Sequence, residues 1–274
     1  MSAVVLALAS AALFGAMTVA VRFGLRSVEP RAAALATILP ALVVALAAVA
    51  VHPDIHGAWP FFLAGFLAPG GSQILFTRAV EAVGASRTSV TVGAAPLVAV
   101  AIALVFLGEP LRWPLIAGAV GVVAGGALLT AERNRPGHLR AAGLLLAAAA
   151  AALFATRDNL VRALHAHSSP GTAAAATLVA GTIAAALWTR RLPTGRELRH
   201  LAPAGLCFGV SYLCLFEAYW HGRVSVVSPL VGTESLWGVG LSAVVFRHSE
   251  GVGRRLVLGA LLVVGGGALI GVVR

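Results

Sequence analysis

The sequence predicts an all-α membrane protein with ten transmembrane helices, arranged as two inverted five-helix repeats. Of its 274 residues, 59% are hydrophobic and only 11% are charged, and the mean hydropathy is +0.93. Ten apolar stretches approach the roughly 20 residues that a membrane-spanning helix needs. In addition, a set of residues from the first half returns in the same order in the second half.

The first half contains five of these stretches, separated by short polar clusters. The first stretch ends at Arg22 and the third at Arg78. The fourth carries Pro96, and the fifth is rich in glycine, which permits close contact between helices. The predicted spans are 3–21, 32–51, 59–77, 88–107 and 114–131.

The second half repeats this organisation. Its first span closes on Arg157-Asp158-Asn159, its third ends in Tyr219 and Trp220, and its last is again rich in glycine. No stretch outside the spans is long enough for a soluble domain. The predicted spans are 139–160, 171–188, 201–220, 224–246 and 255–273.

The recurring residues predict how the two halves are related. Each half contains five spans, and an odd number forces the halves into opposite orientations in the membrane. We therefore predict one repeat over 1–135 and the other over 136–274, meeting around a site near the bilayer midplane. The recurring pairs are Phe14 and Phe154, Arg22 and Arg162, Glu81 and Glu217, Arg87 and Arg223, Ser89 and Ser225, and Glu109 and Glu250.

The composition argues against several other functions. The pI of about 11.5 does not indicate nucleic-acid binding, because the basic residues are scattered over loops between spans. All 20 basic residues are arginines, so a retinal Schiff base and a lysine-containing phosphate loop are absent. Cys207 and Cys214 lie seven residues apart on one predicted helix, about 10 Å, which is too far for a disulfide.

Several marks occur in a characteristic order: Phe14-Gly15 in the first span, Pro96 in the fourth, Gly108-Glu109-Pro110-Leu111 after it, a glycine-rich fifth span, and Glu250 matching Glu109. In this order the chain resembles the EamA-type family of the drug/metabolite transporter superfamily over nearly its whole length. The resemblance implies a central cavity between helices 1–4 and 6–9, with 114–131 and 255–273 at the periphery. Members move amino acids, other metabolites, nucleotide sugars or drugs, usually without ATP.

The orientation in the membrane has two readings. Most arginines fall in loops after odd-numbered spans, which by the positive-inside rule places both termini outside. The family resemblance implies the reverse, with both termini inside. Both orientations remain open.

Glu234 is the first candidate for a substrate or proton site. It lies near the middle of the ninth span, where an ionisable group costs about 3 kcal/mol or more. At this place in the ninth span the family pattern carries a proline, but here the chain reads Gly232-Thr233-Glu234-Ser235. Trp237, three residues further on, shares a helical face with it. A carboxylate at this depth can carry a proton; alternatively, a neighbouring serine, threonine or arginine satisfies it.

Arg157 and Asp158 are the next candidates, at the end of the sixth span. The spacing predicts that Asp158 pairs with Arg162, one helical turn away. Arg157 points about 100° away and is expected to meet Glu234 or an anionic substrate group. The alternative is that Arg157 extends to the membrane interface.

The remaining candidates lie in the eighth and third spans. Tyr212, Ser211 and Glu217 would line the cavity from the eighth span, and Gln73 from the third. The alternative for the aromatic residues is an interfacial belt. Arg78 and Glu81 are more typical of an interfacial salt bridge.

These observations predict a secondary transporter in the plasma (inner) membrane that exports a small, amino-acid-like or related metabolite by alternating access. Proton coupling is possible, and no cofactor is expected. Bends at Pro96, Pro229, Gly93, Gly222 and Gly232 would allow the helices to rock. No catalytic constellation indicates an enzyme, and His52 and His56 occupy a turn rather than a metal site. The alternatives are a lipid-linked or headgroup flippase, or an accessory subunit without transport.

Overall fold

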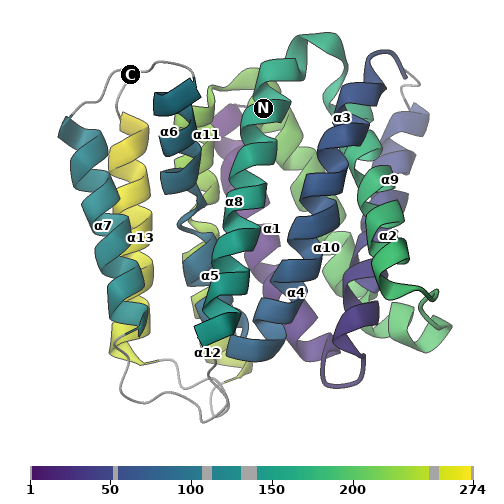
Figure 1. Cartoon of the computed structure of the whole chain (residues 1–274), viewed down its shortest axis with the longest axis horizontal. Helices are drawn as coiled ribbons and strands as arrows, with labels where there is room; N and C mark the ends of the chain where they lie inside the picture. The colour runs from purple at the N-terminus through teal and green to yellow at the C-terminus, as the bar shows by residue number, and fades with distance from the viewer. Residues whose placement is uncertain (1, 52–54, 107–112, 131–140, 247–252, 273–274) are drawn as a thin grey trace.

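The computed structural model describes the whole chain except residues 1, 52–54, 107–112, 131–140, 247–252 and 273–274. Glu109, Glu250 and the stretch 108–111, which helped to establish the resemblance, therefore lie outside the described residues. Within the described part every regular element is helical (Figure 1). The elements are α1 (Ala3–Gly24), α2 (Pro30–Val51), α3 (Ala58–Gly65), η1 (Phe66–Gly71), α4 (Ser72–Val83), α5 (Ala85–Val92), α6 (Ala95–Phe106), α7 (Trp113–Thr130), α8 (Ala141–Leu164), η2 (His165–His167), α9 (Pro170–Thr189), α10 (Gly195–His221), α11 (Val224–Val231), α12 (Glu234–Val245) and α13 (Arg254–Val272).

The all-α class is confirmed for the described residues. In the part of the chain that the structure describes, five helices are long and apolar enough to cross a membrane, and they match five of the predicted spans. The third, fourth and ninth predicted spans are each divided into shorter helices, so the number of ten spans stays a prediction. The five long helices are α1, α2, α8 with η2, α9 and α10.

Local sequence signals explain where several helices begin. Ser169 accepts a hydrogen bond from the backbone N–H of Thr172, and Pro170 fits the first turn because its missing N–H is not needed there. At α10, Thr194 and Glu197 form a reciprocal capping box. Arg191 binds the same Glu197 through two nitrogens, at 2.7 and 2.9 Å, which fixes the α9–α10 turn.

Two helix breaks meet near the middle of the molecule. In the fourth predicted span, α5 ends at Val92 and α6 begins at Ala95. In the ninth, α11 ends at Val231 and α12 begins at Glu234. A Cβ added to Gly93 would lie 3.0 Å from the Gly232 carbonyl oxygen, so the breaks are in direct contact. Discontinuous helices of this kind expose backbone groups beside transporter binding sites.

Contacts between the two halves are reciprocal. α1 packs against α11 and α12 of the second half, while α8, its counterpart, packs against α5 and α6 of the first half. Arg22 donates to the carbonyl oxygen of Val80 (3.4 Å), and its counterpart Arg162 donates to that of Tyr219 (2.7 Å). Each arginine thus binds a backbone carbonyl near the C-terminal end of a helix of its own half, α4 or α10.

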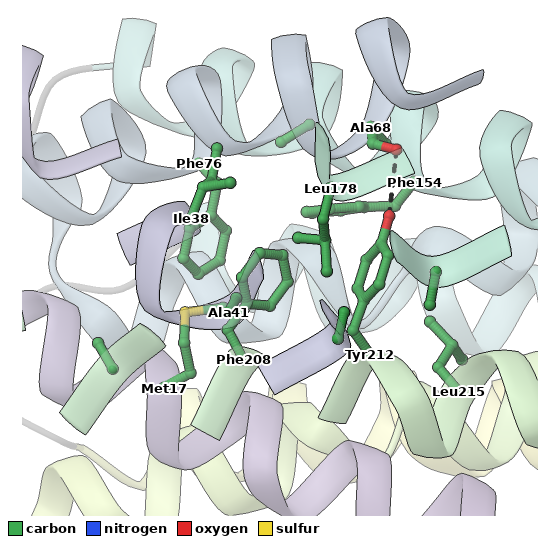
Figure 2. Close-up of a cluster of buried hydrophobic side chains, with 14 of the residues drawn as sticks. Met17, Ile38, Ala41, Ala68, Phe76, Phe154, Leu178, Phe208, Tyr212 and Leu215 are labelled. Carbon is green, nitrogen blue, oxygen red and sulfur yellow. Dashed lines mark hydrogen bonds between the residues drawn. The ribbon is translucent and has the colours of Figure 1, made fainter. Parts of the chain in front are cut away.

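An aromatic core joins the halves at the centre. The ring of Phe14 meets its repeat counterpart Phe154 edge-on, with centroids 5.7 Å apart, and also contacts Phe76 at 5.4 Å and Phe208 at 6.2 Å. Figure 2 shows Phe76 from α4, Phe154 from α8, and Phe208 and Tyr212 from α10 in one cluster. Edge-to-face pairs at these distances add to the stability gained by burial.

α7 and α13 pack against each other at one edge of the molecule, with α13 also touching α11 and α12 (Figure 1). They run antiparallel, because Gly266 approaches Gly118 while Gly125 approaches Gly259. Small residues bring the two backbones close, as the sequence indicated. No described residue of either helix lines the pocket discussed below.

Gly266 and Gly265 provide a matched test of this packing. A Cβ at Gly266 would lie 2.5 Å from the carbonyl oxygen of Gly118, whereas at Gly265 nothing lies within 4 Å. We expect Gly266→Ala to destabilise the protein by about 1–3 kcal/mol because the helices must separate. Gly265→Ala should be neutral or slightly stabilising, since alanine favours helix. Thermal unfolding in detergent measures both, and equal effects would contradict the packing.

Candidate functional site

Glu234 is the first residue of α12 and follows the break after α11 directly. Its side chain is buried, with only 4% of the residue exposed. The neighbouring hydroxyls do not serve it: Thr233 donates to the carbonyl oxygen of Leu230 (2.6 Å), and Ser235 to that of Gly232 (3.0 Å). Among the described residues none donates a hydrogen bond to this carboxylate, so adjacent serine or threonine does not satisfy it.

Arg157 and Asp158 form a buried ion pair near the end of α8. The Nε of Arg157 lies 2.8 Å from Oδ1 of Asp158, and both residues are less than 10% exposed. The guanidinium carbon lies 4.8 Å from the ring centroid of Tyr212 and 5.7 Å from those of Phe154 and Phe216. Arginine therefore has a carboxylate at one edge and aromatic rings around it.

The predicted partner of Asp158 was wrong. Arg162 does not pair with it but donates to the carbonyl oxygen of Tyr219, where the C-terminal part of α10 passes. Arg157, predicted to point away from Asp158, turns back to bind it. Helical spacing places Cβ atoms only, and the long arginine side chain can bend around the helix toward a buried carboxylate and a ring cluster.

A pocket brings these charged groups together. It lies between the N-terminal half of α1, the C-terminal parts of α8 and α10, and the two helix breaks. Glu234 reaches it from the second break, and Arg157 and Asp158 reach it from α8. The lining residues are Ser10, Phe14, Val92, Ala95, Pro96, Phe154, Arg157, Asp158, Leu215, Ser228, Val231, Gly232 and Glu234.

Tyr212 and Ser211 support the pocket from behind. The Tyr212 hydroxyl donates to the carbonyl oxygen of Ala68 (3.1 Å), which is free because the backbone of Ala68 is extended inside η1 (Figure 2). Ser211 lies 3.0 Å from the hydroxyl of Ser10, a lining residue, and also donates to its backbone carbonyl. The two residues therefore hold α10 against η1 and α1 instead of lining the pocket.

Gln73, Glu217 and Trp237 lie outside the pocket. Gln73 is fully buried on α4, with neither amide atom hydrogen-bonded to a described residue. Glu217 is partly exposed and pairs with His221 (3.0 Å). Trp237 is 49% exposed on the outer side of α12. Of the predicted candidates, the structure brings together Arg157, Asp158 and Glu234.

Two lining serines were not singled out from the sequence. Ser10 lies one helical turn before Phe14, and Ser228 precedes Pro229 in the broken ninth span. Helical spacing from Phe14 was a usable signal for Ser10, since residues four apart share a face. For Ser228 the only signal in the sequence was the proline that follows it.

A helical protein with long apolar helices and a charged pocket beside paired helix breaks belongs to the class of membrane transporters. The model of the EamA-like transporter family matches residues 1–131 and again 141–272, so the chain belongs to this family. The resemblance drawn from the sequence is confirmed. No curated protein matches the chain. A solved structure described only as "Crystal structure of protein" is similar in fold, with a TM-score of 0.73 at 20% identity over 97% of this chain and 95% of that one.

Proposed function

We propose that the protein is a secondary transporter that exports a small, amino-acid-like or related metabolite across the plasma (inner) membrane by alternating access. Its ten membrane spans form two inverted five-helix repeats, over 1–135 and 136–274. The substrate binds in the pocket that contains Glu234, Arg157 and Asp158. Protons supply the coupling, with Glu234 as the carrier.

Reciprocal contacts support the inverted repeats. The pairing of α1 with α11 and α12 matches the pairing of α8 with α5 and α6, as expected when a two-fold axis exchanges the halves. Phe14 and Phe154 meet each other, as expected of repeat counterparts that lie near such an axis. The family matches also divide the chain into two parts of nearly equal length.

The buried charges at the junction of the halves are the observation that carries the proposal. Three ionisable side chains are buried in one pocket, where a structural role alone would favour apolar residues. Intramembrane ionisable groups characteristically mark substrate or proton pathways. An uncompensated carboxylate can bind a proton on one side of the membrane and release it on the other.

Tight packing on the other side of Glu234 supports alternation. A Cβ on Gly15 would lie 2.6 Å from the Cβ of Trp237 and 2.9 Å from the Gly238 nitrogen. A Cβ on Gly238 would overlap the hydroxyl of Ser89. α1, α5 and α12 are thus in close contact on that side, while the pocket lies on the other. If the protein changed to the opposite conformation, α1, α5 and α12 would separate, and the side of Glu234 that is now packed would open.

Cysteine accessibility tests alternation. In a variant with Cys207 and Cys214 replaced by alanine, Ser228→Cys reports the pocket side and Ser89→Cys the packed side. We expect labelling of the two positions to change in opposite directions when pH or substrate shifts the conformation. Compounds for this test come from a thermal-shift screen of amino acids, nucleosides and sugar phosphates at two pH values. Ser89→Cys that never reacts under any condition would favour an accessory subunit instead.

A further inference from the structure

The charges that line the pocket do not balance. Among its described lining residues, Arg157 contributes one positive charge and Asp158 and Glu234 contribute two negative charges, a sum of −1. On the elements packed against α12 the other ionisable residues lie outside the lining set. They are Arg22 on α1, Arg87 on α5, and Arg254 and Arg255 on α13.

Arg157 is already engaged. Its Nε binds Asp158 at 2.8 Å, and three aromatic rings surround the guanidinium. Its Nη1 is buried without a hydrogen-bond partner among the described residues, but a substrate carboxylate bound there would add a further negative charge to a pocket that already carries −1. The unbalanced group is therefore the carboxylate of Glu234, to which no described residue donates a hydrogen bond.

We propose, as a refinement that rests on the proposed function, that the substrate is one of the related metabolites and not an amino acid itself. It is a monovalent organic cation: an amine or quaternary ammonium without a carboxylate. Its charge neutralises Glu234. A bound monocation brings the net charge of the pocket to zero, whereas a zwitterion leaves it at −1 and an anion makes it −2. Burying uncompensated charge is costly, so the site selects the cation.

The other residues that line the pocket favour a cation that carries an apolar group. Phe14, Val92, Leu215 and Val231 line the same pocket as Glu234. Phe14 also contributes an aromatic ring to this lining, and aromatic rings attract ammonium groups.

A proton neutralises Glu234 equally well, so proton and cation exclude each other. One monocation leaves as one proton enters, and the carboxylate is neutralised in both loaded states. The exchange is therefore one for one and electroneutral. A zwitterionic substrate has no net charge, so it would not displace the proton from Glu234.

Binding of three compounds that share a phenyl group tests the proposal: phenyltrimethylammonium, phenylalanine and phenylacetate. Titration calorimetry of the purified protein, in buffers with different ionisation enthalpies between pH 5 and 9, gives the affinity and the number of protons released. Phenyltrimethylammonium has no proton to lose, so released protons come from the protein. We expect this cation to bind and release protons, and the other two to bind at least about tenfold more weakly.

Glu234→Gln should weaken cation binding at least about tenfold and abolish the proton release. The control is Glu81→Gln, which removes an exposed carboxylate on α4 and should behave as wild type. Equal binding of phenylalanine, absence of cation binding at millimolar concentration, or proton release that persists in Glu234→Gln would each overturn the proposal. Opposite labelling at Ser89 and Ser228 would then still support a transporter. Conversely, cation binding without alternating labelling would contradict the transport function.

Discussion

Glu234→Gln is expected to leave the protein folded in the membrane and to abolish proton-coupled transport. Glutamine has nearly the same shape but cannot titrate, so a transporter that carries its proton on Glu234 loses the coupling. The residue is buried beside the break between α11 and α12, and the other carboxylate of the pocket, Asp158, is already paired with Arg157. Exchange in proteoliposomes under an imposed pH gradient measures the effect, with phenyltrimethylammonium as the first substrate tested.

The folded state should not suffer from the same substitution. Removing a buried, uncompensated carboxylate eliminates a desolvation cost, so the thermal unfolding temperature is expected to stay the same or rise. Glu81→Gln serves again as the exposed control. A Glu234→Gln protein with an unchanged transport rate and an unchanged pH profile would make Glu234 structural. The search for the site would then move to Arg157 and Asp158, the other charged residues of the pocket.

The sequence was sufficient to identify the charged groups of the pocket. Glu234, Arg157 and Asp158 stand out because ionisable residues are rare within apolar spans, and burial of all three is what the structure shows. The breaks at Gly93 and Gly232 were likewise predicted as bends, since glycine and proline weaken a helix at those places. Composition and local chemistry are visible in a single sequence.

Contacts between residues that are distant in the chain could not be predicted in the same way. Tyr212 seemed a cavity residue, but its hydroxyl binds the carbonyl of Ala68, 144 positions earlier. That carbonyl is free only because η1 departs locally from helical geometry, which the apolar run 59–77 does not reveal. Trp237 was placed on the face of Glu234 by spacing, but α12 begins at Glu234, and the indole lies on the outer side.

Arg157→Gln is expected to be among the most destabilising single substitutions in the chain. It leaves Asp158 and Glu234 as two buried carboxylates in one pocket without a cation, and removing one partner of a buried ion pair typically costs about 3–5 kcal/mol. The stacking against Tyr212 is lost as well. Thermal or denaturant unfolding in detergent, together with the yield of folded protein in the membrane, measures the loss.

The double variant Arg157→Gln with Asp158→Asn separates charge from packing. It removes both members of the ion pair, returns the pocket to one negative charge, and should recover most of the lost stability, because a neutral pair has no buried charge to compensate. If the double variant is as unstable as Arg157→Gln alone, the arginine stabilises the protein through its contacts with Tyr212, Phe154 and Phe216. The ion pair would then be a consequence of that packing and not its cause.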